Sequence, residues 1–203
     1  MSEATIFKHN ESIASYKPIV STGSAHFSAN TTAGAVSTDY PSIVPAIPES
    51  YKIVDAGKYT IFEIADWFLV KSEMTHKKLQ KLCYYAQAWC YALKGYRLAD
   101  TDFQAWVHGP VSPALYERFK GFGYDSIRIV GDYVSQIEEA DVQLLEDVWE
   151  TYGDHTGNAL EVLTHREFPW QEARKGYAPD ERCTVVISPE SMISYYKSIY
   201  AGN

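Results

Sequence analysis

The sequence has no long hydrophobic run and little cysteine. No stretch of about 18 consecutive apolar residues occurs, so we expect no membrane-spanning helix. The first residues lack a basic start followed by an apolar segment, so we expect no secretory signal and a cytoplasmic location. The three cysteines, Cys83, Cys90 and Cys183, include no CxxC pair, and an odd number without a signal favours reduced thiols.

Positive charge is also in deficit. The chain has 18 Lys and Arg against 26 Asp and Glu, a net charge of −8. Binding to nucleic acid needs a basic face, so we expect no direct nucleic-acid partner, whereas a partner with a basic surface would be attracted. Among the acids, Glu138, Glu139 and Asp141 are expected to form a solvated helix start, where they complement the helix dipole.

The motifs of several enzyme classes are missing. The sequence contains no GxxxxGK[ST] loop, no strand-linked GxGxxG and no histidine pair at i, i+4 spacing, so we expect no bound metal and no cofactor. A hydrolase that uses His108 or His165, with Cys183 beside Arg182 as a conceivable nucleophile, remains an alternative. Nothing in the spacing of these residues requires it.

Aromatic residues, in contrast, are abundant. They make up 14% of the chain, with 16 Tyr and 5 Trp. Tyr and Trp join a large apolar body to a polar tip and are enriched in protein interfaces, but they also fill cores. Composition alone leaves both interpretations open.

The composition changes near residue 55. Residues 1–55 are rich in Ser and Thr, carry several prolines and show no sustained hydrophobic period. Such a segment buries too little apolar surface to order itself alone, so we interpret it as an N-terminal arm that is flexible or docks on a partner. Residues 56–203 form the second expected unit.

This second unit shows regular helix signals. Thr60, Thr75, Ser112, Thr156 and Ser188 stand where helix N-caps are expected, and apolar residues recur behind them at helical spacing. We therefore predict a mostly α, compact multi-helix domain with minor short strands. Helices are expected near residues 61–72, 75–95, 112–121, 137–152, 156–163, 169–176 and 189–199, with an extended run at 103–107 and either a strand or a loop at 127–130.

Three ordered motifs lie within this helical unit. Residues 74–98 read MTHKKLQKLCYYAQAWCYALKGYRL, residues 103–123 read FQAWVHGPVSPALYERFKGFG, and residues 163–176 read LTHREFPWQEARKG. In order and spacing they resemble the antitoxin SocA-like family, the Panacea domain, over about residues 58–200. The family motif falls on Lys78, Leu79, Lys81, Leu82, Trp106, His108, Gly109, Pro110, Val111, His165, Pro169 and Trp170, which we expect to be mainly structural.

The resemblance implies an antitoxin from a bacterial or phage toxin–antitoxin pair, and not an enzyme. Its partner would be a cognate protein toxin encoded by a neighbouring gene, blocked by direct binding; toxic small alarmone synthetases are among the family's partners. An alternative in the same family is a proteolytic adaptor that delivers its toxin to an ATP-dependent protease. The aromatic residues beside the helical stripe are the predicted partner contacts: Tyr84, Tyr85, Trp89 and Tyr91.

Overall fold

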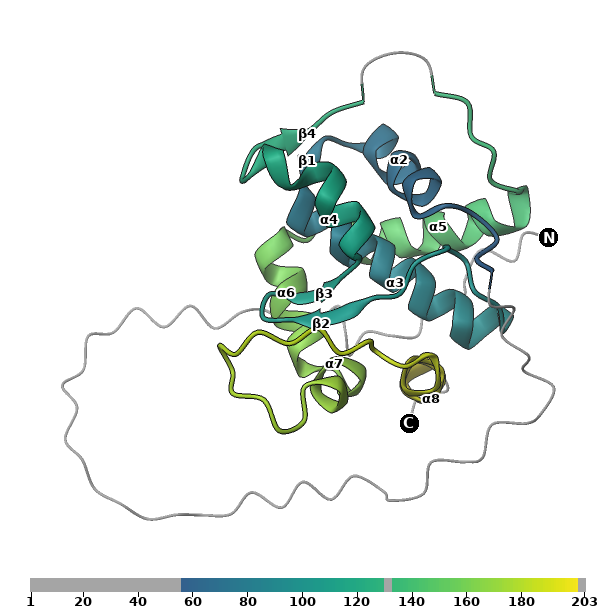
Figure 1. Cartoon of the computed structure of the whole chain (residues 1–203). Helices are drawn as coiled ribbons and strands as arrows, with labels where there is room; N and C mark the ends of the chain where they lie inside the picture. The colour runs from purple at the N-terminus through teal and green to yellow at the C-terminus, as the bar shows by residue number, and fades with distance from the viewer. Residues whose placement is uncertain (1–55, 130–132, 201–203) are drawn as a thin grey trace.

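The computed structural model describes residues 56–129 and 133–200, so the predicted N-terminal arm at 1–55 lies outside the described residues. Figure 1 shows the arrangement of the helices and short strands. The elements are α2 (Ile61–Lys71), β1 (Met74–Thr75), α3 (His76–Lys94), β2 (Gln104–Trp106), β3 (Gly109–Val111), α4 (Pro113–Phe119), the 3-10 turn η1 (Lys120–Phe122), β4 (Ser126–Ile127), α5 (Glu139–Tyr152), α6 (Gly157–Arg166), α7 (Phe168–Ala173) and α8 (Pro189–Tyr200). The prediction of a mostly helical domain with minor strands is confirmed.

Helix α3 runs through the middle of the molecule, with α2, α5, α6 and α8 packed around it (Figure 1). It begins where the Thr75 side chain accepts a hydrogen bond from the Lys78 amide and ends at Gly95, whose φ of 75° gives a left-handed C-cap. Every residue from Leu79 to Ala92 is buried. A helix enclosed on all faces is the axis of the core rather than an amphipathic surface helix.

The remaining helices begin largely at the predicted caps. Thr60 and Glu63 form a capping box at α2, Ser112 caps α4 with a proline in the first turn, and Thr156 caps α6. At α8, the Ser188 hydroxyl accepts a hydrogen bond from the Ser191 amide. None of the helices in the described residues is long and apolar enough to span a membrane.

Two short antiparallel strand pairs hold the loops between the helices. The predicted extended run contains β2, which pairs with β3 so that Ala105 faces Pro110. Near Ile127, where the sequence was compatible with either a strand or a loop, the structure has β4. This strand pairs with β1, with Met74 opposite Ile127. This pairing fixes the loop after α4 against the start of α3.

Of the three acids at the start of α5, Glu138 and Glu139 are exposed as expected, and Asp141 is not. Asp141 is fully buried, whereas we expected a solvated position. Its carboxylate accepts hydrogen bonds from Lys58 Nζ at 2.7 Å, Lys94 Nζ at 2.8 Å and the hydroxyls of Tyr59 and Tyr96. Burial alone would raise the pKa of Asp141, but these hydrogen bonds outweigh it and hold the pKa well below its usual range. Asp141 therefore anchors the start of the described domain to α5.

Candidate functional site

The three motifs predicted from the sequence meet at one buried side chain, Lys81 on α3. Its Nζ donates a hydrogen bond to the carbonyl oxygen of Pro110 at 3.0 Å. Gly109 has a φ of 94°, and a Cβ there would lie 2.6 Å from Lys81 Cε and 2.8 Å from Thr164 Oγ1. The lysine, the Gly-Pro turn and the start of the third motif are thus in direct contact. We call this place the motif junction.

Burial strongly changes the ionisation of Lys81. Desolvation lowers its pKa to about 7, although the negative charge of Glu161 acts in the opposite direction. The amine is completely enclosed. It therefore holds the Gly-Pro turn in place from inside the domain and offers no surface to solvent.

The two histidines of the motifs lie on the outer side of the junction. His108 is exposed over 71% of its side chain, and its Nδ1 hydrogen-bonds the Glu161 carboxylate at 2.9 Å. The same carboxylate binds Lys77 Nζ at 2.6 Å. His165 stacks on the Trp170 ring with centroids 4.0 Å apart, and burial lowers the pKa of His165. The two side chains thus occupy different environments.

The tryptophans of the motifs close the junction. Trp170 Nε1 donates to the carbonyl oxygen of Trp106 at 3.0 Å, and the Trp106 ring meets the Tyr116 ring edge-on at 5.0 Å. This hydrogen bond connects α7 with β2. Both side chains are half-buried. They join the elements that carry the second and third motifs.

The chemistry available at the junction is limited. Within residues 56–129 and 133–200 we find no serine, threonine or cysteine side chain hydrogen-bonded to His108 or His165, which is the contact that activates a nucleophile. Cys183 is buried, and its thiol contacts the carbonyl oxygen of Ala173 at 3.8 Å. In the same described ranges, no cluster of three or more potential ligands could hold a metal ion. The junction is arranged for packing.

The predicted partner contacts on α3 are not at the surface. We predicted these residues as partner contacts from their place beside the helical stripe, but the structure buries all four: Tyr84, Tyr85, Trp89 and Tyr91. Neighbouring helices cover both the apolar stripe of α3 and the aromatic residues beside it. In this conformation they have no surface with which to contact a partner.

One of these aromatic residues, Tyr85, binds a buried acid instead. The Glu167 carboxylate accepts hydrogen bonds from the hydroxyls of Tyr85 at 3.1 Å and Tyr196 at 2.7 Å. The Tyr85 ring stacks on Tyr152 with centroids 3.9 Å apart, and Trp89 Nε1 donates to the Tyr152 hydroxyl. Burial raises the pKa of Glu167 to about 7. Part of the aromatic excess therefore forms a hydrogen-bonded core.

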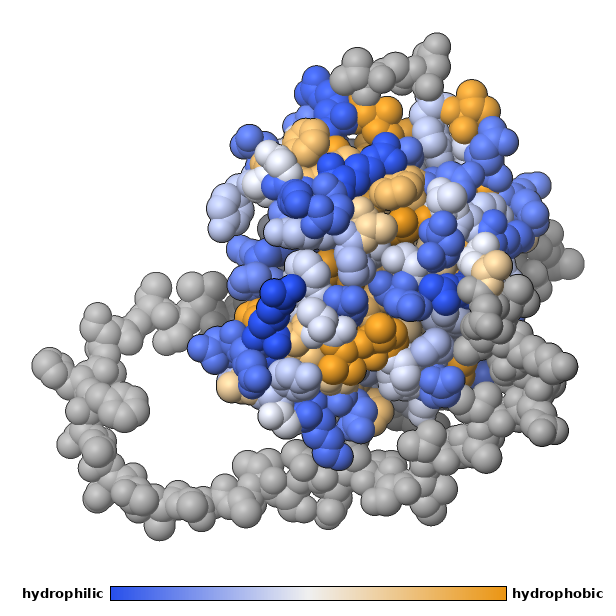
Figure 2. Space-filling model, in the orientation of Figure 1, coloured by the Kyte–Doolittle hydropathy of each residue, from blue (hydrophilic) through white to orange (hydrophobic). Residues whose placement is uncertain are grey.

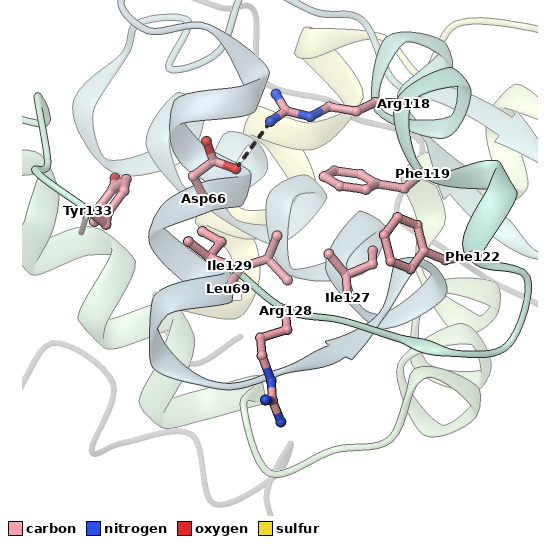
Figure 3. Close-up of a pocket in the computed structure, with 9 residues that line it drawn as sticks. All are labelled: Asp66, Leu69, Arg118, Phe119, Phe122, Ile127, Arg128, Ile129 and Tyr133. Carbon is pink, nitrogen blue, oxygen red and sulfur yellow. Dashed lines mark ion pairs between the residues drawn. The ribbon is translucent and has the colours of Figure 1, made fainter. Parts of the chain in front are cut away.

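An open groove of about 360 Å³ lies elsewhere, between α2, the end of α4 and β4. Its lining mixes apolar and charged side chains and consists of Asp66, Leu69, Arg118, Phe119, Phe122, Ile127, Arg128, Ile129 and Tyr133. Figure 3 shows the carboxylate of Asp66 directed toward Arg118, with the Phe119 and Phe122 rings beside them, while Arg128 extends away. In Figure 2, hydrophobic side chains are visible on the upper half of the molecule, where α2 and α4 lie in Figure 1.

The groove was not predicted from the sequence. The available signal was the segment 121–124, where Phe122 and Tyr124 stand beside glycines and outside any helical stripe. Phe122 is 42% exposed and Tyr124 is 96% exposed. Large aromatic side chains held at the surface in this way are typical of contact surfaces for other proteins.

The fold and these sites define a mostly helical domain in which three separated segments meet on a buried lysine of the central helix. Residues 79–171 match the family model described as antitoxin SocA-like, Panacea domain. The match includes the motif junction, so the resemblance is confirmed over these residues, a shorter range than the 58–200 expected from the motifs. No curated protein and no solved structure matches the chain significantly.

Proposed function

We propose that this protein is an antitoxin that neutralises a cognate protein toxin by binding it directly. The family match over residues 79–171 is the observation that carries the proposal, because that family is described as antitoxin-like. Segments of the three motifs meet inside the domain around the side chain of Lys81. Of the motif residues, Lys81 is enclosed and offers no surface to a partner, whereas His108 is exposed.

Charge and surface chemistry support a protein partner. A net charge of −8 attracts a toxin with a basic surface and repels nucleic acid. The groove, which has apolar and charged side chains and the exposed ring of Phe122, is a recessed surface of the kind that protein interfaces use. Small alarmone synthetases, named by the resemblance, are one toxin class to examine first.

Co-expression with the product of the neighbouring open reading frame tests the proposal. The neighbouring product should arrest growth when expressed alone, and growth should recover when this chain is expressed with it. The two proteins should also co-purify. A non-toxic neighbour, or growth arrest that persists with this chain present, contradicts the proposal.

The same strains separate direct blocking from delivery to a protease. If binding blocks the toxin, the half-life of the toxin should not shorten when this chain is present. A toxin half-life that falls with this chain, and recovers in a strain without the ATP-dependent protease, would replace direct blocking with the adaptor function.

A further inference from the structure

We propose that α8 is a pH-sensitive cover over the aromatic residues of α3. It stays closed while the carboxyl group of Glu167 is protonated, and it opens when that group ionises. The inference goes beyond the proposed function and does not depend on it. It concerns the movement of one helix while the rest of the described domain stays folded. The observations that carry it are the position of Glu167 between helices and the way in which α8 is attached.

The carboxyl group of Glu167 connects α8 to the centre of the domain. It lies at the start of α7 and accepts hydrogen bonds from the hydroxyl of Tyr85 on α3, at 3.1 Å, and from the hydroxyl of Tyr196 on α8, at 2.7 Å. The Tyr196 ring also meets the Trp89 ring edge-on, with centroids 4.9 Å apart. One side chain of α8 therefore both binds the buried acid and covers an aromatic residue of α3.

The surroundings of Glu167 favour the neutral form of its carboxyl group. The titratable groups that interact with it come from three helices and are Tyr84, Tyr85, Tyr152 and Tyr196. Burial raises the pKa of each of these hydroxyls, so they stay neutral. On the α6 side, His165 stacks on Trp170 and Arg166 is exposed. Among the described residues no lysine or arginine acts on the pKa of Glu167, which burial raises to about 7, so the ionised form is a buried charge without a cation.

Opening of α8 would couple to the ionisation of this group. When Tyr196 leaves, water reaches the carboxyl group and its pKa returns toward the usual value of 4.5. Between pH 4.5 and about 7 the open form then holds fewer protons than the closed form, so a rise in pH favours opening. Above about pH 7 the group is ionised in both forms and the effect levels off. The Tyr84 hydroxyl, which is buried without a hydrogen-bond partner among the described residues, would also gain one from water.

The chain immediately before α8 is fixed independently of the helix. Ile187 is buried, and its amide donates a hydrogen bond to the carbonyl oxygen of Phe103 at 2.8 Å. The carbonyl oxygen of Val185 accepts one from the Ala105 amide at 2.9 Å. These bonds hold residues 185–187 alongside β2, so that a movement of α8 need not disturb the segment that leads to it.

Helix α8 itself packs on the domain along one face. Its buried residues are Met192, Ile193 and Tyr196, and Figure 1 shows the helix at the periphery of the molecule beside α7. The other helices around Glu167 are held differently, since α3 is enclosed on all faces and α7 is hydrogen-bonded to β2 through Trp170. A pivot at Ser188, next to the fixed segment, would therefore release α8 as a unit.

Amide hydrogen exchange of the full-length protein tests the inference. The exchange rates of α8 and α3 are measured between about pH 5 and pH 8, at low urea concentrations, and are divided by the intrinsic rates at each pH to give opening constants. Opening of α8 alone exposes little surface, so the exchange of its amides should depend weakly on urea. Amides in the middle of α3 should exchange only when the domain unfolds, with a steep dependence on urea.

In the wild type we expect the opening constant of α8 to rise by up to about tenfold per pH unit until about pH 7 and then to level off. Glu167→Gln keeps an oxygen that accepts a hydrogen bond but cannot ionise, so the opening constant should no longer change with pH. Glu172→Gln is the matched control, because it removes an exposed acid from the same helix and should keep the wild-type pH dependence. Tyr196→Phe keeps the ring and loses the hydrogen bond to Glu167, so it should raise the opening constant at pH 5 by about tenfold.

Three results would overturn the inference. Exchange of α8 with the same steep urea dependence as α3 would mean that the helix does not open by itself. A Glu167→Gln protein that keeps the pH dependence, or a Tyr196→Phe protein with an unchanged opening constant, would mean that this acid and this tyrosine do not hold the helix. Circular dichroism melting verifies that each variant is folded, and if Glu167→Gln does not fold, the wild-type exchange and Tyr196→Phe decide the question. None of these measurements uses a toxin, so the proposed function stands or fails separately.

Discussion

Gly109 lies at the closest approach of the three motif segments. Its φ of 94° falls in the region that favours glycine, and the space where a Cβ would stand is occupied by Lys81 and Thr164. Two requirements therefore act on the same residue: a backbone conformation and the absence of a side chain. The sequence motif Gly-Pro gives the first of these, since such a pair is typical of a turn. The contact with a buried lysine depends on the tertiary structure.

Replacing Gly109 with alanine tests the second requirement. Gly176→Ala is the matched control, because Gly176 has a φ of 91° and no atom lies within 4 Å of the point where its Cβ would stand. We expect the control to lower the free energy of unfolding by about 1 kcal/mol through backbone strain. Gly109→Ala should cost about 1–3 kcal/mol more through crowding. Urea denaturation measures both, and equal losses would show that the junction is not crowded.

Individual residues also show where sequence reasoning stops. The helical stripe through Leu79, Leu82 and Cys83 correctly identified core positions. The same period placed Tyr84 and Tyr85 on an outer face, since a helix packed on one side only exposes the rest. Because α3 is covered on every side, those tyrosines are buried. The Tyr85 hydroxyl donates a hydrogen bond to the carboxylate of Glu167, which lies 82 residues further along the sequence. A local sequence pattern cannot predict a contact between residues so far apart in the sequence.

At the scale of elements, the helix starts were the most predictable features. A short polar side chain before an apolar stripe satisfies the amide groups that the first turn leaves unpaired, so each cap is a local signal. The pairing of β1 with β4 could not be predicted in this way. Each strand has only two residues, and the partners Met74 and Ile127 come together because the intervening helices pack around α3.

The elements are joined by two buried titratable groups, which should make stability depend on pH in opposite directions. Glu167 joins α3 and α8 at the start of α7, and its pKa is raised from 4.5 to about 7. Between these values the folded state holds more protons than the unfolded state, so the free energy of unfolding falls as pH rises. The pKa of Lys81 is lowered from 10.5 to about 7. Between these two values the unfolded state holds more protons than the folded state, so the contribution of Lys81 to the free energy of unfolding rises with pH.

The pH dependence due to Glu167 and the one due to Lys81 can be removed separately by substitution. Glu167→Gln should make the dependence below pH 7 less negative, and Lys81→Met should make the dependence above pH 7 less positive, with each slope limited to about 1.4 kcal/mol per pH unit. Urea denaturation at pH values across the two windows measures both slopes. Because the windows do not overlap, each variant is the control for the other. If a substitution does not change the slope of the free energy of unfolding against pH in the range assigned to the replaced residue, that residue titrates normally in the folded state.

At the scale of the whole molecule, the described domain is anchored close to its first residues. The Tyr59 amide donates to the carbonyl oxygen of Leu98 at 2.8 Å, and its hydroxyl donates to the buried Asp141 carboxylate. Lys58 binds the same carboxylate. Lys58 and Tyr59 thus secure the start of the described residues, while the boundary near residue 55 stays a prediction from the change in composition.

Deleting residues 1–50 tests that boundary and the role of the arm together. The deletion leaves every contact of Lys58 and Tyr59 in place, so the melting temperature followed by circular dichroism should be unchanged. If the arm adds contacts to the toxin, neutralisation should weaken, and calorimetry should show a lower affinity of the truncated protein for the toxin. Full neutralisation by the truncated chain would show that the arm contributes nothing to recognition. A lower melting temperature would instead show that residues 1–50 belong to the folded domain.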